Sequence, residues 1–240
     1  DLLLQEPMSV WKRTFKRLWS RRSGKIGLLL IGFIFLIAFA APVIAPYDPH
    51  EVLIGKEIVK LKKREGPCIH MLGCDSAKPQ HLMGIDGNYR DQFSRIIYGS
   101  RISLSIGFST VSFAVTGGVL LGALAAFFGG WIDNIIMRLM DVILGFPSLL
   151  LAIAIVAVLG PGIRNALLAI AIVTLPAYAR LTRASVLTVK ELDFVKASIT
   201  LGASPTRLLL FRILPNSLTP VVVLATLGIA TAILDAAGLS

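Results

Sequence analysis

The run IGLLLIGFIFLIAFAAPVIAPY, residues 26–47, contains no charged side chain and is bounded by Lys25 and Asp48. A helix of about 20 apolar residues is long enough to cross the hydrocarbon core of a bilayer. Over the whole chain, 55% of the 240 residues are hydrophobic and only 16% are charged, a composition unlike that of a water-soluble domain. The sequence therefore predicts an all-α, polytopic membrane helical bundle whose first transmembrane helix occupies residues 26–46.

Four further apolar runs predict four more transmembrane helices, so that five spans are expected in the chain. Three of these runs, residues 102–132, 142–163 and 213–234, carry no charge and give spans near residues 102–130, 140–160 and 213–236. The fourth, near residues 163–182, is shorter, and it spans if Arg164 and Arg180 extend their side chains toward opposite interfaces. Together these four spans form a membrane core of residues 102–240.

Small residues and prolines are distributed through the predicted spans. Gly118 and Gly122 have the four-residue spacing that permits close helix packing. Pro147 and Pro176 are expected to interrupt helices, because proline removes a backbone N–H and clashes with the preceding turn. Two interpretations are open: ordinary packing of any helical bundle, or the wall of a pathway through it.

The first 25 residues are predicted to form a basic amphipathic helix. In WKRTFKRLWSRRSGK, residues 11–25, the aromatic and leucine side chains fall on one helical face and most of the lysines and arginines on the other. Such a helix lies flat in the membrane interface, where anionic lipid explains the net charge of +10 better than nucleic acid does. Since basic segments stay inside, the N-terminus is predicted to be cytoplasmic.

Residues 47–101 are then predicted to form an extracytoplasmic loop that contains both cysteines of the chain, Cys68 and Cys74. Because this compartment is oxidising, a disulfide between them is the preferred interpretation. Two free thiols in a tolerated insertion are an alternative. A zinc site built from Cys68, His70 and Cys74 is a weaker one, because it lacks an obvious fourth ligand.

Motifs for catalysis are not found in the sequence. All three histidines lie in residues 47–101, and the centres of the predicted spans carry no ionisable residue, which disfavours a proton-coupled carrier. The chain contains no GxxxxGK[ST] phosphate loop, no GxSxG elbow and no HExxH pair. We therefore expect no enzyme activity, no ATP hydrolysis, and no metal or cofactor bound by this chain itself.

A polar, basic stretch, VKASITLGASPTRLLLFRILPNSLTP (residues 195–220), separates two predicted spans. An amphipathic helix over residues 189–200 is predicted to end at Gly202, because glycine commonly follows a helix C-terminus. Ser204 and Pro205 fit the N-cap and the first position of a second helix. The stretch is therefore predicted to turn sharply.

The resulting elbow, residues 190–212, is predicted to be cytoplasmic, because its basic residues outnumber its acidic ones. It could be a plain connector, but a connector does not need such definite caps. It could also be a DNA-binding helix-turn-helix, but its second helix is rich in leucine and offers few side chains for reading bases. The favoured interpretation is a rigid knob that docks onto a cytoplasmic partner.

The elbow also carries a family resemblance. Ala197, Gly202 and Ile213-Leu214-Pro215 resemble the E-A-A…G…I-x-L-P signature of ABC importer permeases, the loop that docks into the ATPase subunit. Longer stretches look like the C-type permease subunit of the dipeptide/oligopeptide/nickel importer family: HLMGIDGNYRDQFSRIIYGSRISLSIGF (81–108), GGWIDNIIMRLMDVILGFPSLLLAIAIVAVLGPG (129–162) and YARLTRASVL (178–187). This resemblance implies a type I importer bundle with a sixth span beyond the chain end.

The resemblance implies that a set of residues in and after the elbow couples the chain to the ATPase: Lys196, Ala197, Ser198, Gly202, Ala203, Ser204, Pro205, Leu214 and Pro215. Lys196 departs from the family pattern, which has glutamate there, and Glu191 or Asp193 could compensate its charge. Tyr89 stands where the family usually has glycine. No substrate-binding residue is assigned.

The function implied by the resemblance is that of a membrane-spanning permease subunit of an ATP-driven ABC importer, which translocates dipeptides or oligopeptides across the cytoplasmic membrane. Import of nickel chelates or other small solutes is the alternative within the family, and an ATP-independent channel or carrier is the alternative outside it. The expected partners are the lipid bilayer, a second homologous permease, two ABC ATPase subunits that bind ATP and Mg, an extracytoplasmic substrate-binding protein and the peptide substrate. Nucleic acid is not expected as a partner.

Overall fold

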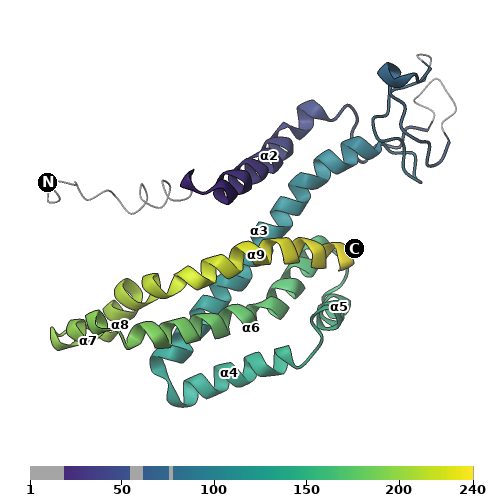
Figure 1. Cartoon of the computed structure of the whole chain (residues 1–240). Helices are drawn as coiled ribbons and strands as arrows, with labels where there is room; N and C mark the ends of the chain where they lie inside the picture. Colours follow the sequence, from purple (N-terminus) through teal and green to yellow (C-terminus); the bar gives the residue numbers. More distant parts are fainter. Residues whose placement is uncertain (1–18, 55–61, 76–77, 240) are drawn as a thin grey trace, which may run out of the picture. The chain divides into compact units, whose positions relative to one another are not determined.

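The computed structural model of this chain describes residues 19–54, 62–75 and 78–239, and in these ranges most residues are helical (Figure 1). Most of the amphipathic helix predicted within the first 25 residues lies outside the described residues. The all-α prediction is confirmed, since the described ranges contain only two isolated β-bridges besides their helices. The chain divides into two compact units, residues 1–102 and 103–240, which we describe separately.

In the first unit, helix α2 (Arg22–Ile44) is long and apolar enough to cross a membrane. It ends at Ile44, and the N–H of the next residue, Ala45, donates to the Ala41 carbonyl oxygen. A loop then leads to helix α3 (Gln92–Phe128) and contains the short 3-10 helix η1 (His70–Leu72). The first span predicted from the sequence, residues 26–46, thus corresponds to α2.

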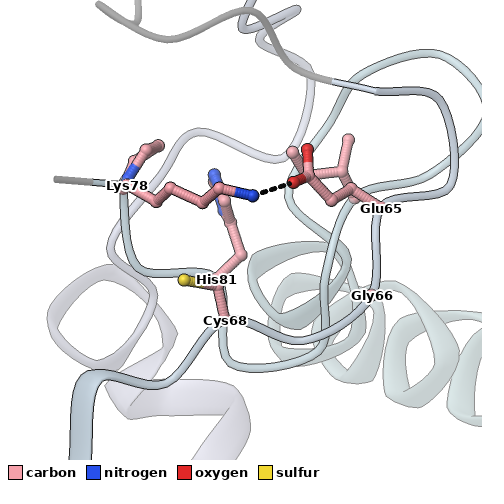
Figure 2. Close-up of a pocket in the computed structure, with 7 residues that line it drawn as sticks. Glu65, Gly66, Cys68, Lys78 and His81 are labelled. Carbon is pink, nitrogen blue, oxygen red and sulfur yellow. Dashed lines mark hydrogen bonds and ion pairs between the residues drawn. The ribbon is translucent and has the colours of Figure 1, made fainter. Parts of the chain in front are cut away.

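A disulfide joins Cys68 and Cys74 in this loop, with their Cα atoms 5.4 Å apart. His70 Nε2 lies 2.8 Å from the Lys78 carbonyl oxygen. Figure 2 shows the Lys78 side chain reaching Glu65, with Nζ 3.1 Å from the carboxylate oxygen, beside Cys68. Because both sulfurs are in the disulfide, they are not available as metal ligands. In the described parts of the chain, no group of three or more His, Cys, Asp or Glu residues could hold a metal ion.

A buried polar cluster fixes where α3 begins. His81 Nδ1 lies 2.9 Å from Asp91 Oδ1, and both side chains are almost fully buried. The other carboxylate oxygen of Asp91 accepts the backbone N–H of Ser94 at 2.7 Å, as an N-cap residue does. The ring of Tyr47 stacks on His81 with the ring centroids 5.0 Å apart. Since buried polar groups are stable only when they are hydrogen-bonded, this cluster ties the loop to the helix.

The turn before α3 explains one departure from the family pattern. Tyr89 has φ +58°, the left-handed conformation that glycine adopts without steric penalty. Asp86 holds the turn closed, because its Oδ1 accepts the N–H groups of Asn88 at 2.7 Å and Arg90 at 2.9 Å. Lys63 Nζ lies 5.8 Å from the centroid of the Tyr89 ring, a cation–π distance. The turn therefore tolerates a side chain at this strained position.

Two carboxylates of the loop, Asp86 and Glu65, have lowered pKa values. Burial raises the pKa of Asp86, but the Arg90 and Asn88 N–H groups and the Arg90 charge outweigh burial, so that this pKa lies below its ordinary value of 3.8. The Lys62 N–H and the Lys78 ammonium likewise lower the pKa of Glu65 below its ordinary value of 4.5. Both carboxylates therefore favour their ionised form more than free side chains do.

The second unit packs around helix α6 (Ile163–Lys190), which lies between α9 (Leu214–Leu239) and α4 (Gly130–Leu144) in Figure 1. Helix α5 (Ser148–Leu159) also packs on α6. The main apolar core joins α6, α9 and residues 103–128 of α3. Its buried members are Val111, Ala114, Ile170, Ala171, Tyr178, Val221 and Ala232.

Glycines allow α3 to approach α6 closely. A Cβ added at Gly118 would lie 2.5 Å from the Tyr178 Cβ, and one added at Gly122 would lie 2.3 Å from the Ala179 carbonyl oxygen. Neither position has room for a residue other than glycine, because real Cβ contacts are not this short. The spacing noted in the sequence thus serves helix packing in this structure, the first of the two interpretations given above.

The candidate spans match the prediction in number but not in every boundary. Four helices are long and apolar enough to cross a membrane, and α4 with α5 makes a fifth candidate that is bent by 93°. The stretch near residues 140–160 is thus not one helix. It breaks at residues 145–147, because Pro147 cannot continue α4 and instead precedes the first turn of α5. Pro176, by contrast, lies inside the continuous α6.

Two ion pairs fasten α4 to α6. Arg183 forms a bidentate pair with Asp133, in which Nε and one terminal nitrogen each lie 2.6 Å from a carboxylate oxygen. Arg180 pairs with Asp141 along the same helices. These partners are far apart in the sequence, so the break after α4 leaves this helix anchored to the core rather than free.

Candidate functional site

The elbow predicted from the sequence is formed by helix α7 (Asp193–Thr200) and the single turn α8 (Pro205–Leu208). Between them Gly202 has φ +81°, the left-handed conformation expected just after a helix. The Gly202 N–H donates to the Ile199 carbonyl oxygen at 2.9 Å, and the Ala203 N–H donates to the Ser198 carbonyl oxygen at 3.1 Å. These bonds satisfy two carbonyls at the end of α7.

The beginning of the elbow differs from the prediction in one respect. A single helix was expected over residues 189–200, but α6 continues to Lys190 and α7 starts separately at Asp193. The Glu191 and Leu192 N–H groups turn back to the carbonyl oxygens of Thr188 and Val189 and so close the break. Ser204 occupies the N-cap position of α8, but its hydroxyl makes no capping hydrogen bond there.

After α8 the chain forms one turn of π-helix, η2 (Leu209–Ile213), before α9 begins. The N–H of Leu214 donates to the Leu209 carbonyl oxygen, five residues earlier. Pro215 explains this widening, because it has no N–H to donate and its ring would collide with the carbonyl of Phe211 in a regular helix. The second half of the elbow, α8 with η2, therefore continues into α9 as one helix.

The inner side of the elbow is packed firmly against the membrane core. Val195 of α7 and Ile213 of η2 are completely buried, and Leu208 of α8 is nearly so. They form one apolar cluster with three residues of α3 and α6: Ala126, Val186 and Val189. The ends of α6 and α9 therefore cannot move independently of α7 and α8 without opening this cluster.

The outer side of the elbow is a concave surface that we name the docking surface. It encloses a hollow of 630 Å³ lined by Ser198, Leu201, Gly202, Ala203, Ser204, Arg207, Leu208, Phe211 and Arg212. Leu201 is 87% exposed and Phe211 is 72% exposed, which is unusual for large apolar side chains at an aqueous surface. The Arg207 and Arg212 side chains are also exposed, and neither forms an ion pair with a described residue.

Only some of the predicted coupling residues line the docking surface. Ser198, Gly202, Ala203 and Ser204 line the docking surface. Ala197 and Pro205 are exposed beside it, while Leu214 and Pro215 follow η2 and do not line it. Lys196 is exposed, and its Nζ lies 3.4 Å from Glu191 Oε2, one of the two compensating partners considered above.

Four exposed residues of the docking surface were not among the coupling residues predicted from the sequence. Leu201, Phe211, Arg207 and Arg212 line it, but none of them belongs to the family signature. Their exposure depends on how α7 folds back beside η2, which a helical pattern in either segment alone does not reveal. The sequence did contain one indication, because Arg207, Phe211 and Arg212 lie outside the buried apolar face of the second helix.

Two known protein families match parts of the chain. Residues 118–240, which include the whole elbow, match the family described as binding-protein-dependent transport system inner membrane component. Residues 9–62 match the N-terminal TM domain of oligopeptide transport permease C.

Individual relatives cover most of the chain. A dipeptide transport system permease protein of Alkalihalophilus pseudofirmus is 41% identical over 97% of this chain and 71% of its own length. A di/tripeptide transport system permease protein of Pseudomonas aeruginosa is 44% identical over 98% of this chain and 75% of its own length. A glutathione transport system permease protein of Escherichia coli is 37% identical over 96% of this chain and 71% of its own length.

Proposed function

The chain belongs to the family of binding-protein-dependent transport system inner membrane components, and from this membership we propose that it serves as the C-type permease subunit of an ATP-driven peptide importer. The family and the apolar helices make it a multi-pass membrane protein. Members are transporter subunits rather than enzymes, and ABC importers of this type work with ATPase, binding-protein and second permease partners. Here the proposal is that a homologous permease and two ABC ATPases, which bind ATP and Mg, assemble with this chain.

One observation carries the proposal: the elbow is buried on its inner side and open on its outer side. Val195, Leu208 and Ile213 fix it to the core, whereas Leu201 and Phe211 are exposed on the docking surface. An exposed apolar hollow with a cationic rim fits a protein partner that offers apolar side chains and carboxylates. Such a partner pushes on a rigid lever rather than on a flexible loop.

The mechanism follows from that rigidity. When the ATPases close around ATP, they displace the docking surface, and the shared cluster transmits this displacement to the cytoplasmic ends of α6 and α9. Rocking these helices against the second permease opens the pathway to one side of the membrane at a time. This chain contributes coupling and a pathway wall, with the N-terminus and the elbow in the cytoplasm and the Cys68–Cys74 loop outside.

Peptides are the proposed substrate. The names of three similar permeases specify dipeptides, di/tripeptides and glutathione, all of which are short peptides. The extracytoplasmic binding protein is proposed to select the peptide and deliver it to the permease pair. This assignment favours peptides over nickel chelates within the same family.

The test is uptake of radiolabelled alanyl-alanine by proteoliposomes that contain this chain with its companion subunits and binding protein. We expect uptake that requires ATP on the side of the membrane where the ATPase subunits lie, and that stops when ATP is depleted. The variant Lys196→Glu should retain the thermal stability of the wild type, because its ion pair with Glu191 is exposed, but should bind the ATPase subunits less tightly. Uptake that continues without ATP would identify a channel or carrier instead.

A further inference from the structure

One carboxylate in the membrane core has no role in the docking surface. Asp235 lies in the last two turns of α9, within a helix long and apolar enough to span the membrane. Its side chain is partly buried and makes no hydrogen bond or ion pair with any residue that the structure describes. Ionisable groups in spanning segments are energetically unfavourable, so that those present usually serve transport or binding.

Asp235 lines a small cavity between α5, α6 and α9. The other lining residues are Ser148, Leu149, Ala152, Ile170, Val173 and Thr174. The cavity has 10 Å³ of room for the centre of a water-sized group, which is about one water molecule or one ammonium group. The cavity can therefore take a single small group of a solute, such as an ammonium, and not a whole solute.

The polar atoms of the cavity are well suited to accept hydrogen bonds. The Asp235 carboxylate accepts only, and the Thr174 hydroxyl already donates to the Ile170 carbonyl oxygen at 2.9 Å, which leaves its lone pairs free. Ser148 adds a second hydroxyl. A primary ammonium has three donors and no acceptor, and its charge complements that of Asp235.

The cavity also lies next to the break in the fifth candidate span. Ser148 is the first residue of α5, immediately after the 93° bend that follows α4. In membrane transporters, interrupted helices are tolerated where they border a protein-lined pathway, and substrate sites are found there. The position of the carboxylate therefore coincides with a second feature that is typical of such sites.

We propose that Asp235, with Thr174 and Ser148, binds the α-amino group of a peptide as it passes through the permease. This inference rests on the proposed function, since the dipeptides and glutathione named for similar permeases all carry a free primary amino group. Asp235 supplies the charge, and the two hydroxyls orient the ammonium toward it.

The first test uses cysteine labelling, because both native cysteines are held in the disulfide. Leu149→Cys places a thiol in the cavity wall, where a cationic aminoethyl and an anionic sulfonatoethyl methanethiosulfonate compete for it. The ratio of cationic to anionic labelling should fall about tenfold when Asp235→Asn is added, as expected for the loss of one charge a few ångströms away. Asp193→Asn, which removes a carboxylate from α7, is the control and should leave the ratio unchanged.

The second test uses transport. Asp235→Asn should raise the KM for alanyl-alanine about tenfold while the complex still assembles and hydrolyses ATP, and N-acetyl-alanyl-alanine should compete equally with both forms. An unchanged labelling ratio, or no labelling of Leu149→Cys by either reagent, would overturn the proposal. Failure of the wild-type complex to take up peptide with ATP, with the labelling ratio still dependent on Asp235, would instead overturn the importer function.

Discussion

The rigid attachment of the elbow predicts a specific effect of shortening Val195. This side chain is completely buried and is the only buried residue of α7. Val195→Ala removes two methyl-sized groups from the cluster with Val186 and Val189, which should destabilise the docked state of α7 by about 2 kcal/mol. That free energy corresponds to about a 30-fold rise in the population of the opened elbow.

Hydrogen exchange and transport report the two consequences separately. The amides of residues 193–200 should exchange about 30-fold faster in the variant, because α7 opens more often. Peptide uptake per ATP hydrolysed should fall, since a loosened elbow transmits less of the ATPase movement. The matched control is Val43→Ala, the same substitution at a side chain that is 89% exposed in α2.

Two results would refute the reasoning. Unchanged exchange in α7 would mean that the Val195 cluster does not hold the elbow. Faster exchange with fully retained coupling between hydrolysis and uptake would mean that a rigid elbow is not required for transport.

Three other features give predictions. Gly122→Leu should separate α3 from α6, because even the Cβ atom of the new side chain would lie 2.3 Å from the Ala179 carbonyl oxygen. The variant should lose its monodisperse peak in size-exclusion chromatography, whereas Gly27→Ala, whose Cβ would meet no atom within 4 Å, should keep it. Reduction of the Cys68–Cys74 disulfide, or Cys68→Ser with Cys74→Ser, should weaken the loop by about 2 kcal/mol and speed its limited proteolysis; equal proteolysis with and without reductant would contradict this. The pKa of Asp86 is lowered in the folded loop, so the stabilisation of the loop by this carboxylate is complete above the ordinary pKa of 3.8 and is lost as the pH falls through and below that value. Asp86→Asn should remove this acid dependence from the hydrogen exchange of residues 86–91. An acid transition that persists in the variant would assign it to another group.

Local patterns in the sequence predicted the apolar helices and the turn of the elbow. The uncharged run before Asp48 became α2, and Gly202 adopts the left-handed conformation that its position after α7 indicates. Both features are local. The first depends on the length of one apolar run relative to the thickness of the bilayer, and the second depends on the conformational freedom of a single glycine. A single sequence is sufficient for features of this kind.

Features that depend on distant partners were not predictable in the same way. The docking surface exists because Phe211 and Leu201 come together when α7 folds back beside η2. The break after α4 is stable because Asp133 meets Arg183 in another helix. The carboxylate of Asp235 lines a cavity only because of its neighbours on α5 and α6. Each of these requires contacts between elements, which periodicity along one element does not contain.

The most direct test of the central claim is site-specific photo-cross-linking from the docking surface in the assembled complex. A benzophenone amino acid at position 201, where Leu201 is 87% exposed, should form a covalent product with an ABC ATPase subunit, and the yield should change when ATP is added. The same probe at position 43, on α2, should give no such product. Cross-links from position 201 that never reach an ATPase, in a complex that still imports peptide with ATP, would contradict the account.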